Sequence, residues 1–204
     1  MDILGVDEAG RGSVLGPMVI AGVIVPEKME KVLERMGVKD SKRLTPNRRV
    51  ILSRKLKKMF EYDMIVISAR EIDEMRADGI NLNEIEKKAM EELILRLNPQ
   101  KAIVDAVDVK AERFQENLRK DTGLDIIAEH KADDNYIQVS AASIIAKAER
   151  DAQIAEINKE FIKQGGIGSG YPSDPTTKKF LTNYTYDEMP DFVRRSWNTV
   201  AKMK

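Results

Sequence analysis

The opening stretch of the chain constrains the fold most, because an apolar run there stops abruptly at two adjacent acids. Residues 3–6 predict a buried strand, which Asp7 and Glu8 end. Three glycines follow between residues 10 and 16, and apolar residues resume at Met18. The pattern predicts a strand, an acidic strand end, a tight glycine loop and a second strand.

The chemistry of this stretch points to a cation beside a phosphodiester. A carboxylate at the end of a buried strand is costly to desolvate unless it binds a cation or hydrogen-bond donors. Glycines let backbone N–H groups approach a ligand without interference from a Cβ atom. The alternative is an ordinary hairpin with surface acids, and this stretch alone does not decide between the two.

The composition narrows the class of site. The chain has 204 residues, 42% of them hydrophobic, which fits one domain with a small appendage. It has no cysteine, which excludes disulfides, zinc–thiolate sites and thiol catalysis and fits a reducing cytoplasm. A single histidine disfavours a histidine-based metal cluster or a conventional hydrolytic triad. Any catalytic metal should therefore be a hard, oxygen-liganded cation such as Mg²⁺ or Mn²⁺.

Membrane and export signals are not evident. No apolar run reaches the length of a membrane helix, and the first strand is not preceded by a signal peptide. We therefore expect a cytoplasmic protein without membrane contact.

Further apolar runs predict four more strands, over residues 18–25, 63–69, 101–105 and 124–129. Helices are predicted over residues 27–36, 45–60, 83–97, 111–120 and 134–161. The helix over 45–60 is predicted to bury Ile51, Leu52, Leu56 and Met59. The helical crossovers before the fourth and fifth strands permit parallel pairing with the first. The predicted class is α/β, a five-stranded mixed sheet flanked by helices, with a small, mostly helical C-terminal region.

Three of the predicted strands end in acids or lead directly to them: Asp7-Glu8, Asp105 and Asp133. If the first, fourth and fifth strands are parallel neighbours, their carboxyl ends meet at one edge, where open α/β sheets bind ligands. Four carboxylates gathered there repel one another, and divalent cations relieve that repulsion. Two cations roughly 3.5–4 Å apart can clamp the attacking and leaving oxygens of a phosphodiester. Competing acids close in sequence are Asp108, Asp121, Asp125 and Asp134, the last of which can exchange the roles of helix cap and ligand with Asp133.

A basic stretch lies between Lys39 and Lys58, where nine lysines and arginines face the single acid Asp40. This asymmetry fits a track for a phosphate backbone. We interpret the later members as a solvated helix face. Ser41 and Lys42, on the loop before the helix, are predicted to contact phosphate.

Six ordered motifs make the sequence resemble ribonuclease HII, a branch of the ribonuclease H-like nucleases. They are Gly5–Gly12, Lys39–Lys42, Val104–Asp105, Glu129–Asp133, Ala142–Arg150 and Gly168–Pro175. The last motif resembles the archaeal type. The resemblance implies a ribonuclease H-like catalytic domain over residues 1–164 and a small substrate-binding region over residues 165–204.

The resemblance also implies an activity. It is that of an endonuclease that cleaves the RNA strand of RNA/DNA hybrids, and single ribonucleotides embedded in duplex DNA, leaving a 3′-hydroxyl and a 5′-phosphate. The implied catalytic residues, which also hold Mg²⁺ or Mn²⁺, are Asp7, Glu8, Asp105 and Asp133.

The implied substrate contacts follow from the need to sense a 2′-hydroxyl, the group that separates RNA from DNA. In the family this falls to the loop matching Gly10-Arg11-Gly12, with a tyrosine matching Tyr171 packed on the sugar. Ser41 and Lys42 would hold the DNA strand. Three other motif residues either lie near the acids or have an orienting or charge-balancing role: Lys131, Lys147 and Arg150. His130 is interpreted as a structural hydrogen-bonding residue, with a catalytic role as the alternative.

The expected partners are nucleic acids, and the protein is expected to be a monomer. Residues 197–204 carry no convincing sliding-clamp motif, which argues against clamp recruitment. Two alternatives stand beside the endoribonuclease: a nucleic-acid-binding module without catalysis, suggested by the basic stretch, and a ribonuclease H-like nuclease that cuts DNA.

Overall fold

The computed structural model describes all residues, Met1–Lys204. The chain forms two compact units, each drawn from separate stretches of sequence. Unit 1 consists of Met1–Ala9, Val19–Ile65 and Asn83–Ala148, and unit 2 of Gly10–Met18, Val66–Leu82 and Glu149–Lys204. The domain boundary expected at residue 164 stays a prediction.

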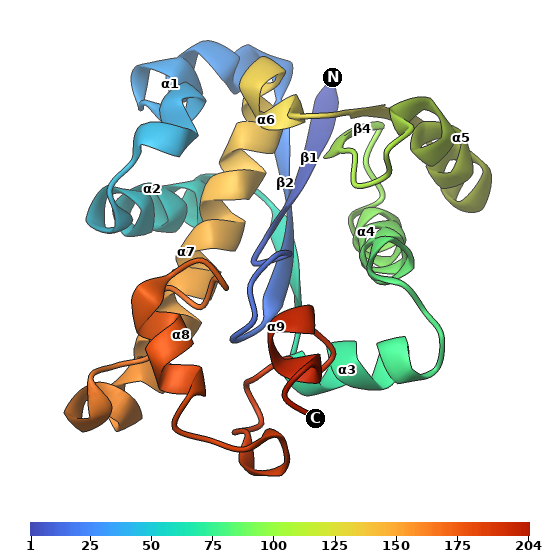
Figure 1. The fold of residues 1–204 in the computed structure, drawn as a ribbon. Helices are drawn as coiled ribbons and strands as arrows, with labels where there is room; N and C mark the ends of the chain where they lie inside the picture. The colour runs from blue at the N-terminus through green and yellow to red at the C-terminus, as the bar shows by residue number, and fades with distance from the viewer. The chain divides into compact units, whose positions relative to one another are not determined.

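Unit 1 is built on a five-stranded sheet with the order β3-β2-β1-β4-β5. The strands are β1 (Asp2–Ala9), β2 (Met18–Pro26), β3 (Tyr62–Ile67), β4 (Lys101–Asp105) and β5 (Asp125–Glu129). Strand β1 pairs antiparallel with β2 and parallel with β4, and β4 pairs parallel with β5 (Figure 1). The α/β class, the five strands and the parallel pairing of the first, fourth and fifth are thus confirmed.

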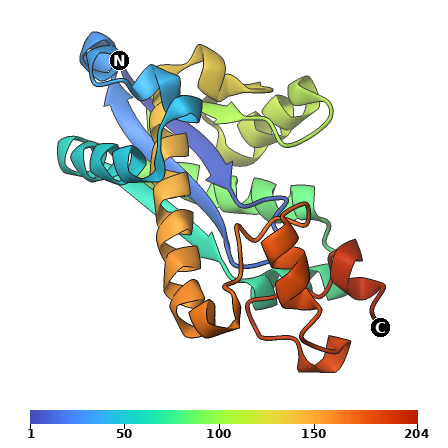
Figure 2. The same ribbon diagram turned by 60° about the vertical axis from the view of Figure 1, so that its left-hand side comes forward.

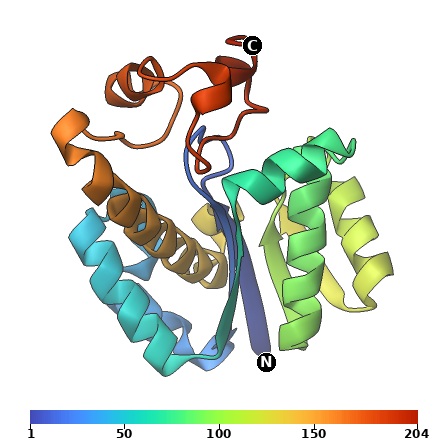
Figure 3. The ribbon, with the colours of Figure 1, turned by 90° about the horizontal axis from the view of Figure 1, so that it is seen from below.

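Helices cover both faces of this sheet. Figure 3 shows α1, α2 and α7 on one face and α4 and α5 on the other. Their bounds are α1 (Glu30–Arg35), α2 (Pro46–Met59), α4 (Leu82–Leu97), α5 (Ala111–Thr122) and α7 (Ile137–Phe161). The main core lies between the sheet and the first three of these helices, with alternate β2 residues such as Val23 packed against Leu52 and Ile145. Burial of this apolar surface is the main force that holds the layers together.

Helix α2 begins as the sequence predicts, because the Thr45 side chain accepts a hydrogen bond from the Arg48 amide and Pro46 opens the first turn. Its buried face is narrower than predicted. Leu52 and Leu56 are fully buried, whereas the side chains of Ile51 and Met59 are 45% and 40% exposed. The prediction for Ile51 and Met59 is therefore wrong, because only one stripe of this helix meets the sheet.

The helix predicted over residues 134–161 is broken in two. A short helix, α6 (Ala132–Asn135), ends before Tyr136, which is extended with φ −126° and ψ 121°, and α7 begins at Ile137. The Tyr136 hydroxyl donates a hydrogen bond to Glu129 Oε1 at 2.8 Å. The break separates α6, which follows β5 after two residues, from α7, which runs along one face of the sheet (Figure 2). A Cβ atom on Gly5 of β1 would lie 2.1 Å from the Gln138 carbonyl carbon, so only glycine permits this approach.

Unit 2 has a separate core rich in aromatic rings. It contains α3 (Ala69–Ala77), α8 (Pro175–Leu181), α9 (Asn198–Ala201) and the end of α7, much of it orange and red in Figure 1. Phe161, Phe180 and Phe192 meet with ring centroids 5.1–5.9 Å apart. The loop 10–17 is tied to this core by a bridge between Leu15 and Val193. No helix in either unit has the length and apolar character that a membrane crossing requires.

Candidate active site

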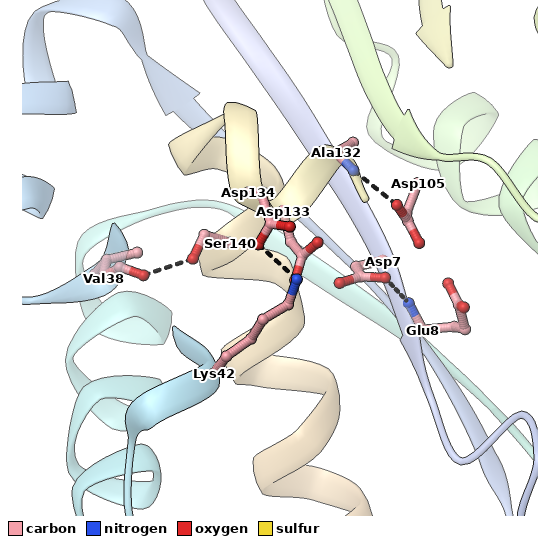
Figure 4. Close-up of polar contacts among 9 residues, drawn as sticks. All are labelled: Asp7, Glu8, Val38, Lys42, Asp105, Ala132, Asp133, Asp134 and Ser140. Carbon is pink, nitrogen blue, oxygen red and sulfur yellow. Dashed lines mark hydrogen bonds and ion pairs between the residues drawn. The ribbon is translucent and has the colours of Figure 1, made fainter. Parts of the chain in front are cut away.

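The sheet register places two of the predicted acids side by side. Val6 of β1 is paired with Val104 of β4 in parallel, so the next residues, Asp7 and Asp105, are neighbours where this pairing stops. Asp105 is the last residue of β4, and Asp7 lies two residues before the end of β1. Glu8 follows Asp7, and one carboxylate oxygen from each of the three acids lies within 4.8 Å of the others. Figure 4 shows the three side chains around the ends of these strands. We refer to Asp7, Glu8 and Asp105 as the acidic cluster.

The acidic cluster is electrostatically strained. Burial raises the pKa of Asp7 well above its ordinary value, and the neighbouring charges of Glu8 and Asp105 raise it further. Burial also raises the pKa of Asp105, opposed by a hydrogen bond from the Ala132 amide to its Oδ1 at 2.8 Å. The Glu8 amide donates to Asp7 Oδ1 at 2.8 Å, which offsets only part of the cost. Three carboxylates in this arrangement need positive charge to remain ionised.

The fourth predicted acid, Asp133, lies beside the acidic cluster in unit 1 and is held by a lysine. It is a buried residue of α6 whose charge contributes to the raised pKa of Asp105. The Lys42 ammonium lies 3.3 Å from Asp133 Oδ2 and 2.5 Å from Asp134 Oδ1 (Figure 4). These contacts, led by the hydrogen bond to Asp134, raise the pKa of Lys42, so the lysine is charged.

A short 3-10 helix, Val38–Arg43, carries Lys42 to this position. It is fixed to α7 because the Ser140 hydroxyl donates to the Val38 carbonyl at 2.5 Å. Ser41 of the same helix is only 2% exposed. A side chain this buried is poorly placed to contact a substrate. Lys42, in contrast, is exposed and contacts Asp133 and Asp134.

The competing acids have partners elsewhere. Asp108 accepts two hydrogen bonds from Arg113, at 2.6 and 2.8 Å, and Asp121 pairs with Lys87 at 2.6 Å. His130 contacts the Val109 carbonyl oxygen through Nε2 at 3.1 Å, and its charge lowers the pKa of Asp105. None of them belongs to the cluster of groups that could hold a metal ion.

The acidic cluster suits a hard divalent cation. Its donors are all carboxylate oxygens, which Mg²⁺ and Mn²⁺ prefer. A cation there would relieve the repulsion that raises the pKa of Asp7 and Asp105.

The glycine loop, residues 10–17, lies in unit 2 and is shaped by a buried arginine. Arg194 is fully buried, and its guanidinium donates to the carbonyl oxygens of Gly10 at 2.7 Å, Arg11 at 3.0 Å and Gly16 at 3.0 Å. Burial, with repulsion from Arg150, lowers the pKa of Arg194 to about 9. A cation placed so deeply is stable here because carbonyl dipoles surround it.

A second buried arginine joins the glycine loop to Tyr171. Arg150 donates to the Pro17 carbonyl at 2.7 Å, to Ser13 Oγ at 2.5 Å and to the Leu15 carbonyl at 3.0 Å. Its guanidinium carbon lies 5.8 Å from the centroid of the Tyr171 ring, which is 41% exposed. Arg150 therefore orients unit 2 elements, which is one of the two roles that the sequence left open.

The two outer glycines of the predicted ribose loop differ in their surroundings. Gly10 has φ 82°, and a Cβ atom there would lie 2.6 Å from Arg150 Cδ. A Cβ atom placed on Gly12 would meet no atom within 4 Å, because that side of the loop is open. Gly10 therefore shapes the loop, and Gly12 leaves space beside it.

Sequence reasoning missed Arg194. Two adjacent arginines in the tail, Arg194 and Arg195, predict surface positions, and nothing in the spacing of Arg194 indicates carbonyl partners 178–184 residues away. The one available signal is its place between the apolar pair Phe192-Val193 and Trp197.

Comparisons with known proteins point to one family. The family model described as ribonuclease HII matches residues 4–200. A curated ribonuclease HII from Methanobrevibacter smithii is 80% identical over all of this chain and 99% of its own length. The crystal structure of ribonuclease H2 from Pyrococcus horikoshii superposes with a TM-score of 0.88 at 43% identity, covering 100% of this chain and 97% of that one.

A second solved structure, the complex of PCNA with ribonuclease HII from Archaeoglobus fulgidus, has a TM-score of 0.89 at 42% identity and covers 97% of this chain and 96% of that one. Sequence and fold thus agree over nearly the whole length. The chain belongs to the ribonuclease HII family and is by that membership a metal-dependent endonuclease of the ribonuclease H type.

Proposed function

We propose that this enzyme hydrolyses the RNA strand of RNA/DNA hybrids, and single ribonucleotides embedded in duplex DNA, with two divalent cations, leaving a 3′-hydroxyl and a 5′-phosphate. The observation that carries the proposal is the acidic cluster, whose oxygens lie within 4.8 Å of one another at the carboxyl ends of β1 and β4. A module that only binds nucleic acid gains nothing from three mutually repelling acids, of which Asp7 is buried and Glu8 and Asp105 are half-buried. Family membership sets that alternative aside.

Asp7, Glu8, Asp105 and Asp133 are the proposed metal ligands and catalytic residues. Bound Mg²⁺ or Mn²⁺ would supply activation of water and neutralisation of the charge that develops on the phosphodiester. The acids contribute the negative potential that attracts the cations. The Ala132 amide orients Asp105 through its hydrogen bond to Oδ1.

Lys42 is proposed to have two partners in turn. In this structure its ammonium balances Asp133 and Asp134. Cations bound by the acids would compete for those carboxylates, so the exposed amine would be available to a backbone phosphate. Lysine serves as a mobile point charge, which suits such an exchange.

Ribose recognition is assigned to the glycine loop and Tyr171. Arg194 engages the carbonyl oxygens of Gly10 and Arg11, so these acceptors turn toward the interior of unit 2. The open side at Gly12 allows a sugar to approach the backbone closely. The exposed Tyr171 ring would pack on the sugar, held in place by Arg150. An enzyme that reads a 2′-hydroxyl in this way rejects all-DNA substrates.

The expected partner is a duplex that contains ribonucleotides, bound by a monomer. The structure of the Archaeoglobus fulgidus relative is that of a complex with PCNA. Sliding-clamp contact is not proposed for this chain.

The test is cleavage of an end-labelled DNA duplex that carries one ribonucleotide, with Mg²⁺ or Mn²⁺. We expect a single cut on the 5′ side of the ribonucleotide, with a 3′-hydroxyl that a polymerase can extend. The matched all-DNA duplex should stay intact. Equal cleavage of both duplexes would support a DNA nuclease instead, and a 3′-phosphate or cyclic phosphate end would contradict hydrolysis by metal-activated water.

A further inference from the structure

Unit 2 contains a pocket beside the glycine loop to which the proposed function assigns no ligand. Its volume is about 310 Å³. Two arginines, an indole and short polar side chains line it, namely Arg11, Arg76, Trp197, Ser196, Asn198 and Thr199. No carboxylate lines the pocket. A depression with this lining favours an anion.

Trp197 joins the pocket to the glycine loop. Its indole Nε1–H donates to the Gly12 carbonyl at 3.3 Å, and Gly12 is itself part of the pocket wall. The Arg194 guanidinium carbon lies 4.7 Å from the centroid of the indole ring. The same buried arginine that shapes the loop therefore also supports the ring that forms the pocket.

Arg76 supplies exposed positive charge. It lies in the last turn of α3, and its guanidinium carbon is 5.0 Å from the Trp197 centroid. This stacking fixes the orientation of the guanidinium, which lowers the entropy lost when it binds a ligand. Arg70 on the same helix is different, because its charge is paired with Glu74 at 2.8 Å.

Asp73 of α3 lies close to the pocket residue Ser196 and already has hydrogen-bond partners. Asp73 accepts hydrogen bonds from the Arg195 amide at 2.8 Å, the Ser196 amide at 3.1 Å and the Ser196 hydroxyl at 2.5 Å. Its negative charge therefore stabilises the turn at residues 195–196 and does not pair with Arg76.

We propose that the pocket formed by Arg11, Arg76 and Trp197 binds a backbone phosphate of the nucleic acid. The inference deepens the proposed function and rests on it, since Arg11 and Gly12 belong to the loop assigned to ribose. The phosphate is one that neighbours the recognised ribonucleotide. Guanidinium groups bind phosphate oxygens in pairs of hydrogen bonds, and such contacts add affinity that does not depend on sequence.

The experiment measures equilibrium binding of a fluorescein-labelled duplex with one ribonucleotide, without divalent metal, over a series of salt concentrations. The variant is Arg76→Ala, and Arg70→Ala is the matched control on the same helix. We expect Arg76→Ala to raise Kd about tenfold and to reduce the slope of log Kd against log salt by about one, because one phosphate contact is lost. Arg70→Ala should leave both unchanged, and Arg76→Lys should restore most of the slope.

A second readout reports the pocket directly. Trp197 is the only tryptophan in the chain, so intrinsic fluorescence monitors this ring. Duplex binding should change its emission in the wild type and in Arg70→Ala, and less in Arg76→Ala.

The outcomes separate this inference from the proposed function. Equal Kd and equal salt slope for Arg76→Ala and Arg70→Ala would overturn the phosphate site. Weaker binding of the ribonucleotide duplex alone, with all-DNA binding unchanged, would overturn it too, because a phosphate site acts on both. If the wild type bound the duplex but did not cleave it, the proposed function would be contradicted. The difference in duplex affinity between Arg76→Ala and Arg70→Ala would still test the phosphate site.

Discussion

The acidic cluster and the glycine loop both bury charge, and they stabilise it in opposite ways. In unit 1, three carboxylates lie within 4.8 Å of one another and their burial raises the pKa of Asp7 and Asp105. In unit 2, Arg194 and Arg150 are buried among carbonyl and hydroxyl oxygens that satisfy their donors. The negative charge of the acidic cluster therefore needs a cation to balance it, whereas the buried arginines of the glycine loop already have hydrogen-bond partners. The difference suggests that unit 1 carries the chemistry and unit 2 the recognition.

Among the variants that test the difference between the acidic cluster and the glycine loop, Asp7→Asn is expected to have the largest effect on cleavage. Removing one charged ligand should lower cleavage by about 10³-fold or more, because a catalytic metal supplies several kcal/mol of transition-state stabilisation. Duplex affinity should change little. The measurement is single-turnover cleavage beside a binding titration.

Asp134→Asn is the matched control for this change. Asp134 contacts Lys42 but lies outside the acidic cluster. It should retain activity within about tenfold, an expectation that rests on one exposed ion pair being worth little. Comparable losses in both variants would show that the cluster has no special role.

A smaller effect separates the two glycines of the loop. Gly10→Ala places a Cβ atom against Arg150 at a positive φ, so it should distort the loop and lower the melting temperature. Gly12→Ala has open space in this structure, so it should melt like the wild type. We nevertheless expect Gly12→Ala to lower kcat/KM on the single-ribonucleotide duplex by about 10- to 100-fold, if a lost backbone contact costs about 1.4–2.7 kcal/mol.

Thermal melts and kinetics of the two variants check this prediction. Full activity in Gly12→Ala would mean that no substrate group approaches that side of the loop. A Gly10→Ala melting temperature equal to that of the wild type would mean that Arg150 can move to make room for the added Cβ atom.

The smallest effect concerns the stability of the metal-free protein. A carboxylic acid whose pKa is raised by folding binds more protons in the folded state, so the free energy of unfolding falls as the pH rises from the ordinary range of aspartate through the raised pKa. Burial gives Asp7 this behaviour. At neutral pH, Asp7→Asn should therefore melt above the wild type, by about 2–4 °C for each kcal/mol of strain removed.

Melts in EDTA between pH 4 and 8 test this expectation. The difference between Asp7→Asn and the wild type should grow as the pH rises. Lower stability of Asp7→Asn across the whole range would show that the carboxylate is stabilised by its surroundings.

Much of the fold was predictable from residues 3–8 and 101–105, because short apolar runs that stop at an acid identify strands and their ends. The same pattern predicted that Asp7 and Asp105 meet if the first and fourth strands are parallel neighbours, which the helical crossovers permit and the observed pairing confirms. The break at Tyr136 was not predicted, because the apolar residues on both sides of it fit one continuous helix. The contact of the Tyr136 hydroxyl with Glu129 on a different element also leaves no signal in the local sequence.

The two arginines that support the glycine loop could not be predicted from the sequence either. Arg150 and Arg194 act through carbonyl oxygens of a distant segment, and backbone acceptors carry no residue-specific signal in a sequence. The ion pair between Lys42 and Asp133 depends in the same way on the path of the Val38–Arg43 helix.

Calorimetric titration of Mn²⁺ into the wild type, Asp7→Asn and Gly10→Ala tests the division between the two units most directly. We predict that Gly10→Ala binds Mn²⁺ like the wild type and that Asp7→Asn binds at least about tenfold more weakly, which corresponds to a loss of about 1.4 kcal/mol. Wild-type affinity in Asp7→Asn would contradict the assignment of the metal to the acidic cluster.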